Sequence, residues 1–233
     1  MNTRRILLPL ALLLMVFGSL QAQFGVSGHY LSGQAENWEY DPPLSSLDRV
    51  EFPGNGWQVG VDYWFRLKNT RIEFLPTLAF TQQEQTIGSE PITLDAQMQG
   101  IHFFFNTNIY LLDLAGDCDC PTFSKEGPTL EKGFFLQLSP GYSLFNFDMT
   151  DNGTGTSYEA DDSAFSIGFG LGFDLGLSDF FTLSPMLGAR YYPEVSWETL
   201  GGEQGLVFPG EVSAESDLLQ YQLGLRMGFR LDN

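Results

Sequence analysis

The chain has 233 residues, of which 29 are acidic and 11 basic, and its formal net charge is −18. This length allows one or two domains, and the excess of carboxylates would repel phosphates, so we expect no nucleic-acid partner. The two cysteines are too few for a fold built on disulfides.

Residues 1–22 have the pattern of a cleaved signal peptide. Arg4 and Arg5 precede an apolar run from Ile6 to Leu20, and Ala22 ends the segment. The run is too short for a typical transmembrane helix. We therefore expect the chain to be exported and the mature protein to be one domain of residues 23–233.

The rest of the chain alternates large apolar with small or polar residues, the pattern of a β-strand. In Phe165–Leu175 the large residues fall on odd positions, and Ser, Gly and Asp lie between them. Such runs are longer than the roughly five or six residues of typical globular strands. Eight runs show the pattern: 24–33, 55–66, 71–83, 97–112, 133–146, 163–176, 180–192 and 217–231.

Two features of these runs predict a membrane barrel, namely their length and the composition of the face that carries the small and polar residues. Phe165–Leu175 covers ten steps of about 3.3 Å, and at a tilt of about 40° it rises about 25 Å, the height of a barrel's lipid-facing band. A soluble barrel would need a richly charged outer face, whereas the second face here holds mainly Gly, Ser, Asn and Gln. We therefore predict an all-β fold, an eight-stranded antiparallel up-and-down transmembrane barrel.

The connections alternate in length. Short ones at 67–70 and 177–179 alternate with long ones at 34–53, 84–96, 147–162 and 193–215. This layout predicts extracellular long loops and periplasmic termini. The connection 113–131 is long but falls on the periplasmic side; a strand pair hidden there would make ten strands.

Pro76, Pro140 and Pro185 fall on the outer face, where each marks either a β-bulge, our preferred interpretation, or a strand end.

The signal peptide and three segments resemble small bacterial outer-membrane β-barrel proteins, the PorT-like and OmpX-like barrels. The segments are GFFLQLSPGYSLF (133–145), GFGLGFDLGLSDFFTLSPMLGARYYPE (168–194) and YQLGLRMGFRL (221–231). The resemblance covers residues 23–233 and implies a place in the bacterial outer membrane, in contact with its lipid. It implies no particular activity, because such barrels host adhesion, porin-like, enzymatic and secretion-accessory roles.

Acidic residues dominate the predicted extracellular loops, with 18 acids against one base, Arg49. They can form a solvated surface, dock a basic partner or bind divalent cations. Glu159, Asp161 and Asp162 offer hard oxygen ligands of the kind that Ca²⁺ prefers, although without EF-hand spacing. Ca²⁺ is the one cofactor that the sequence suggests.

Charged residues also fall on the predicted bore face. They are Asp62, Glu73, Asp174, Arg190, Arg226 and Arg230. Buried charges need partners, and we predict that Arg226 pairs with Asp62 or Glu73. The network would either plug the narrow bore or conduct protons or ions. His29 and His102 share this face, and catalysis by either would need a serine or acid within hydrogen-bond reach.

Three further groups complete the candidates. Cys118 and Cys120 could form a strained local disulfide or pair with another chain. Trp38 and Trp197 lie in loops, as packed anchors or exposed contacts. A membrane-interface girdle is predicted from Trp57, Tyr63, Phe80, Tyr110, Phe181 and Tyr191.

The sequence favours a non-enzymatic role, in surface interaction or as an accessory component of an envelope or secretion assembly. A narrow channel and a lipid-modifying barrel enzyme are the alternatives. No catalytic residue is assigned, and the chain contains no P-loop or dinucleotide fingerprint.

Overall fold

The computed structural model describes residues 23–40, 50–67, 70–89, 92–114, 133–178, 180–200 and 213–230. Its strands are β1 (Gln23–Tyr40), β2 (Val50–Tyr63), β3 (Phe65–Arg66), β4 (Ile72–Ser89), β5 (Ile92–Ile109), β6 (Phe134–Asp151), β7 (Thr156–Phe173), β8 (Leu175–Gly176), β9 (Phe181–Ser196) and β10 (Glu215–Arg230), with a 3-10 helix, η1 (Leu111–Asp113). In the described part of the chain, no helix is long and apolar enough to cross a membrane. The predicted signal peptide, Cys118, Cys120 and most of the 113–131 connection lie outside the described residues.

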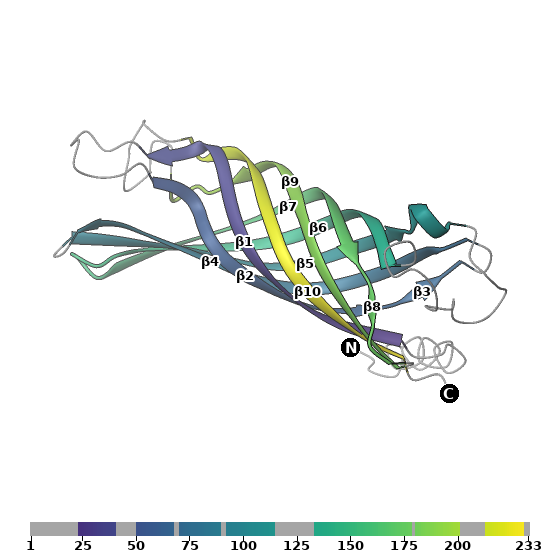
Figure 1. The fold of residues 1–233 in the computed structure, drawn as a ribbon. Coiled ribbons are helices and arrows are strands. Elements are labelled where there is room, and N and C mark those ends of the chain that lie inside the picture. Colours follow the sequence, from purple (N-terminus) through teal and green to yellow (C-terminus); the bar gives the residue numbers. More distant parts are fainter. Residues whose placement is uncertain are drawn as a thin grey trace, which may run out of the picture.

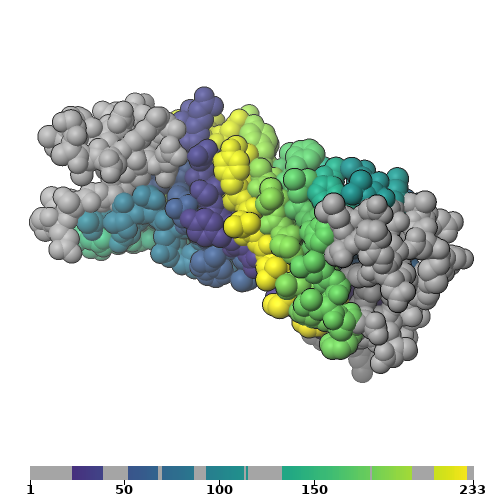
Figure 2. All heavy atoms as spheres, viewed as in Figure 1, coloured from purple at the N-terminus to yellow at the C-terminus, as the bar shows by residue number. Residues whose placement is uncertain are grey.

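The strands form one closed antiparallel barrel (Figure 1). Their order is β10-β1-β2-β4-β5-β6-β7-β9, and β9 pairs with β10 to close the ring. β1 and β10, purple and yellow in Figure 2, lie side by side on the face shown there. β3 continues β2 against β4, and β8 continues β7 against β9, so the ten labelled strands make eight barrel strands. The predicted fold class is confirmed. Gln23 pairs with Arg230, so both ends of the described chain lie at the end of the barrel that carries the short connections.

The three prolines interrupt the ladders without shifting the register. The β2–β4 ladder stops at Thr77 and resumes, in register, through β3 at Phe74, and Pro76 lies in this gap. Pro140 lies in an equivalent gap between β5 and β6, and Pro185 in one between β7–β8 and β9. The predicted bulges are therefore wrong at all three positions. Proline removes one backbone donor, and here the sheet tolerates a short unpaired stretch instead of adding a residue.

A broad band of exposed apolar side chains surrounds the barrel. Phe165, Phe169 and Leu223 are 73 %, 62 % and 66 % exposed, while alternate residues of the same strands face inward, as the two-residue period predicted. Trp57 and Tyr191 are exposed along this band, in keeping with the predicted girdle. Tyr110 is 0 % exposed, however, and its place in the girdle is wrong. A band this extensive suits hydrocarbon rather than water.

Two of the predicted long loops are mostly strand. β4 runs to Ser89 and β5 starts at Ile92, while β6 runs to Asp151 and β7 starts at Thr156. The error has a physical cause, which β6 shows. Within the exposed apolar band, residues of β6 such as Leu138 and Leu144 point outward. From Phe145 on, the apolar residues of β6 point inward and are buried. The apolar face changes sides without a register shift against β7, which marks the passage from lipid to water outside the barrel.

At this outer end the barrel divides into two sheets. β2 pairs with β4 only as far as Asn55 with Glu84, and the ladder of β7 with β9 begins at Ile167 with Tyr191. Beyond these points β9-β10-β1-β2 forms one sheet and β4-β5-β6-β7 the other, whose hairpins project at the left of Figure 1. An apolar cluster fills the space between them, as in a β-sandwich. It contains Ala35, Trp38, Phe52, Ala96, Met98, Phe145, Phe147, Met149, Ala164, Tyr192, Val195, Trp197, Leu200 and Leu218.

Candidate functional site

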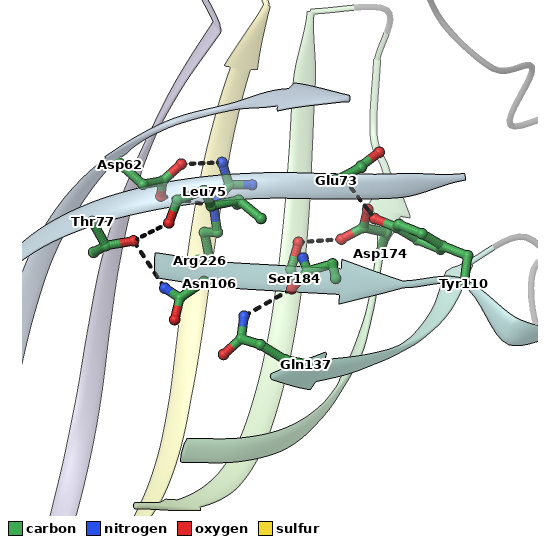
Figure 3. Close-up of polar contacts among 11 residues, drawn as sticks. Asp62, Glu73, Leu75, Thr77, Asn106, Tyr110, Gln137, Asp174, Ser184 and Arg226 are labelled. Carbon is green, nitrogen blue, oxygen red and sulfur yellow. Dashed lines mark hydrogen bonds and ion pairs between the residues drawn. The ribbon is translucent and has the colours of Figure 1, made fainter. Parts of the chain in front are cut away.

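A bidentate ion pair spans the half of the bore nearer the short connections. Arg226 of β10 donates from Nε to Asp62 Oδ2 at 2.8 Å and from Nη2 to Oδ1 at 2.5 Å, which confirms the predicted pairing (Figure 3). The pair passes over β1 at Gly25, which is aligned with Asp62 on one side and Gly228 on the other. A Cβ on Gly25 would lie 2.5 Å from both Asp62 and Arg226. Glycine at this position therefore leaves the space that the ion pair occupies.

Tyr110 is the centre of a second polar group. Its hydroxyl lies 2.9 Å from Glu73 Oε2 and 2.6 Å from Asp174 Oδ2, and Ser184 donates to the other Asp174 oxygen at 2.5 Å (Figure 3). Arg71 lies over the tyrosine ring at 4.3 Å from its centroid. Two of the predicted bore residues, Glu73 and Asp174, thus meet through a residue that sequence reasoning had assigned to the surface. The even position of Tyr110, in phase with the bore-facing residues of β5, was the signal for its true place.

Arg190 stands apart from both groups. It is 3 % exposed and donates to the Ser139 carbonyl at 2.9 Å, to Ser166 Oγ at 3.0 Å and to Ser139 Oγ. Its guanidinium stacks on Phe104 at 3.6 Å from the ring centroid. Among the described residues it has no carboxylate partner. The structure places Arg190 in the bore, as predicted, but outside the charge network; the Arg230 side chain lies outside the described residues.

Both histidines face the bore. His29 Nδ1 and Gln58 Nε2 are 3.3 Å apart, so the amide donates to the ring. His102 lies between Thr81 Oγ1 and Ser143 Oγ, each at 2.7 Å. Sequence reasoning missed Thr81 and Ser143, which supply the serine that a catalytic histidine would need. His102 and Ser143 are both 0 % exposed, and the second ring nitrogen meets a hydroxyl rather than a carboxylate, so this group is built as a structural polar layer.

Aromatic residues close the bore above this layer. Trp197 stacks with Phe147 at 4.7 Å between ring centroids and packs against Trp38 at 5.6 Å and Phe52 at 6.0 Å. Both tryptophans are 0 % exposed, so they are packed anchors rather than exposed contacts. Three cavities lined by described bore residues measure only ≈ 20, ≈ 20 and ≈ 30 Å³, which is room for about a water molecule or two each. The described bore is filled by side chains.

The three residues of the predicted Ca²⁺ site do not converge. Glu159 and Asp161 are exposed on the outer face of β7, whereas Asp162 belongs to its opposite face and accepts from the Ser196 N–H at 2.7 Å. Asp161 accepts from Asn146 Nδ2 at 2.9 Å. Among the described residues, no group of three His, Cys, Asp or Glu side chains is placed to hold a metal ion.

The tips of the two long hairpins are joined by polar contacts. Asn152 donates to Asp95 Oδ2 and to Thr93 Oγ1, both at 2.8 Å. Hydrogen bonds from Asn152 and Thr86 hold the pKa of the Asp95 carboxyl below its usual value. The Thr154 hydroxyl and the Gly153 N–H lower the pKa of Asp151 in the same way. These carboxylates therefore stay charged well into the acidic range.

The outer end is acidic on the other sheet as well. An open cavity of ≈ 270 Å³ is lined there by Glu36, Asn37, Glu194, Ser213, Glu215, Ser216 and Asp217. The described stretches beyond the apolar band contain no Lys or Arg. The described outer surface is thus a continuous source of negative potential.

No protein-family model and no curated protein matches the chain. Among solved structures it is similar to Ail, the attachment invasion locus protein of Yersinia pestis, solved with the heparin analogue sucrose octasulfate (12 % identity, 90 % of this chain and 100 % of that chain, TM-score 0.48). It is also similar to Neisserial surface protein A (11 %, 89 % and 97 %, 0.43) and to outer membrane protein AlkL (15 %, 93 % and 94 %, 0.37). These are small outer-membrane barrels, in keeping with the OmpX-like resemblance, while the PorT-like resemblance stays a prediction. At these identities and scores the likeness carries no functional argument.

Proposed function

We propose that this chain is a bacterial outer-membrane protein that binds a cationic partner at the cell surface and forms no open pore. The observation that carries the proposal is the division of the outer end into two sheets around an apolar core. The core blocks the bore, and the sheets beyond it display carboxylates instead of an apolar band. The short connections lie at the opposite end, which corresponds to the periplasm in barrels of this kind.

The channel and enzyme alternatives have less support. A channel would need a continuous path, but the ion pair of Asp62 and Arg226, the layer of His102 and the aromatic cluster occupy successive levels of the bore. An enzyme would need substrate access to His102 and Ser143, both of which are buried. Binding on the outer sheets requires neither a path nor a buried reactive group.

β7 offers an edge on which a partner can add a strand. Residues 156–161 pair with β6 alone among the described strands, because the ladder with β9 covers only Ile167–Gly172. Ser157, Glu159 and Asp161 are exposed along this stretch. An extended segment binds such an edge through backbone hydrogen bonds, and the two carboxylates favour Lys or Arg at alternate positions. We infer that the partner is an extended basic segment of another envelope or secretion protein.

Peptide binding tests this mode. A short peptide of alternating Lys and Thr is titrated against the purified barrel in detergent and followed by fluorescence anisotropy. We expect Glu159→Gln/Asp161→Asn to weaken binding by about two- to thirtyfold, since each of the two exposed ion pairs contributes about 0.2–1 kcal/mol. The control Glu36→Gln/Glu215→Gln removes the same charge from the other sheet and should change little.

A peptide with alternate amides N-methylated separates strand addition from general charge attraction. It keeps the charge and loses backbone donors, so we expect it not to bind. Equal binding of both peptides would disprove the edge mode, and no binding of either would disprove the proposed function in its cationic form.

Orientation and closure have their own tests. In a Cys118→Ser/Cys120→Ser background, Ser157→Cys should react with a membrane-impermeant maleimide on intact cells, whereas Ser178→Cys, equally exposed but in the β8–β9 turn, should react only after the cells are opened. The pure protein in a planar bilayer should give no steady current. A stable single-channel conductance would favour the channel instead.

A further inference from the structure

Arg190 is a buried charge without a counter-charge. Its guanidinium meets two serines, a carbonyl and an aromatic ring, and no carboxylate among the described residues. Arg226, another bore arginine, bonds by contrast to both oxygens of Asp62. An unpaired ion inside a protein is costly, so Arg190 calls for a compensating negative charge.

Two donors near Arg190 also lack acceptors. Arg190 Nε and Gln222 Nε2 are buried, and neither has a hydrogen-bond partner among the described residues. In the β9–β10 ladder, Arg190 is aligned with Gln220 and Gln222 with Gly188, so the two side chains are diagonal neighbours on the bore face. Gln220 itself bonds across the bore to Gln83. The unmatched groups of these two residues are both donors, and they come from adjacent strands, whereas the unmatched acceptors Gln220 Oε1 and Gln58 Oε1 belong to residues that do not line the cavity described next.

Both residues line one small cavity in the middle of the bore. Its volume is ≈ 20 Å³, and its polar lining is made by His29, Gln137, Ser139, Arg190 and Gln222, with no carboxylate. The rest of its wall is apolar and is formed by Gly168, Phe169, Gly170, Met186, Leu187, Gly188 and Ala189. The volume suits about one particle of the size of a water molecule, which favours a monatomic anion over phosphate or sulfate.

We propose that this cavity binds a monatomic halide, chloride in the cell, held by Arg190 and Gln222. Asp62 and Arg226 line a second cavity, of ≈ 30 Å³, together with Arg190 and Gln222. They neutralise one another and leave Arg190 as the source of the local positive potential. Since Gln58 donates to His29 Nδ1, a neutral His29 carries its proton on Nε2 and adds no negative charge. The halide makes the burial of Arg190 tolerable and couples barrel stability to the anion.

Bromide supplies a direct probe. Crystals of the detergent-solubilised protein grown in sodium bromide should show an anomalous peak within hydrogen-bond distance of Arg190 and Gln222. A water at that position, with no anomalous signal, would overturn the proposal.

Thermal unfolding supplies the functional readout. At constant ionic strength, replacing gluconate by chloride should raise the Tm of the wild-type protein, because a ligand that binds only the folded state stabilises it. The Tm of Arg190→Met should not respond. The matched control Asp62→Asn/Arg226→Gln removes the paired bore charges and should keep the chloride response.

A second variant keeps the test decisive if Arg190→Met fails to fold. A Cβ on Gly170 would meet the Leu187 carbonyl at 3.2 Å and Gln137 Cβ at 3.6 Å, so Gly170→Ala fills the cavity with only a small shift and retains Arg190. It should abolish the bromide peak and the chloride response. A chloride response that survives in both variants would show that the halide acts elsewhere.

Discussion

The Asp62–Arg226 pair makes a quantitative and asymmetric prediction. Arg226→Gln leaves the carboxylate of Asp62, whose side chain is 2 % exposed, without its cation. Removal of one partner from a buried pair costs about 3–5 kcal/mol. Asp62→Asn should cost less, about 1–3 kcal/mol. The reason is that Arg226 keeps two other carboxylates nearby, since Glu73 and Asp174 line one ≈ 20 Å³ cavity together with it.

The double variant Asp62→Asn/Arg226→Gln decides whether this reasoning holds. It removes both charges and keeps polar groups of similar size, so its loss should be smaller than that of Arg226→Gln alone. Unfolding in urea from lipid vesicles, followed by tryptophan fluorescence, gives the three free energies of unfolding. Losses that simply add would mean that the two side chains are not coupled, and the bidentate pair would then have no energetic role.

Three further predictions concern other parts of the barrel. Tyr110→Phe removes the hydroxyl between two buried carboxyls and should lower the free energy of unfolding by about 1–3 kcal/mol, an effect absent if the hydroxyl is dispensable. Trp197→Ala should cost about 3–5 kcal/mol, and planar-bilayer recordings should still show no current, because the polar levels below remain filled. The pKa of Asp151 is lowered by Thr154 and Gly153. The hairpin contacts of Asp151 should therefore be present above the usual Asp pKa and be lost only as pH falls through the lower, folded-state value. A carboxyl titration by NMR with a midpoint at or above about 3.9 would contradict this.

The sequence was sufficient for the membrane-spanning part of the fold. Along Phe165–Leu175 the apolar residues keep one parity through the whole apolar band, and the structure exposes them as expected. Parity assigns each residue to lipid or to the bore, and it placed Asp62 and Arg226 on the bore face. The sequence left two points open that the structure decides, a hidden strand pair that would have made ten strands and Glu73 as the alternative partner of Arg226. Tyr110 was misplaced only where residue type was given more weight than parity.

The interior contacts were beyond sequence reasoning, because they depend on neighbours that are distant in the chain. Ser143 and Thr81 meet at His102 from three different strands, and nothing local in the sequence brings them together. Glu159, Asp161 and Asp162 show the converse. Their closeness in sequence suggested a shared ligand, but adjacent residues of a strand point to opposite faces, so the strand that replaced the predicted loop separates Asp162 from Glu159 and Asp161.

The change of apolar side along β6 explains why the outer strands look like loops in the sequence. At the outward-facing positions of β6, Leu144 is followed by Asn146 and Asp148. Taken alone, these positions indicate that the strand ends there. The inward positions Phe145 and Phe147 show that it continues with its apolar face reversed. The outer face of this strand therefore contacts lipid along the first half of the strand and water along the second half. Because the second half has its own buried core, the outer sheets can carry a dense acidic surface without support from the membrane, and substitutions in that surface should leave the lipid-spanning barrel unchanged.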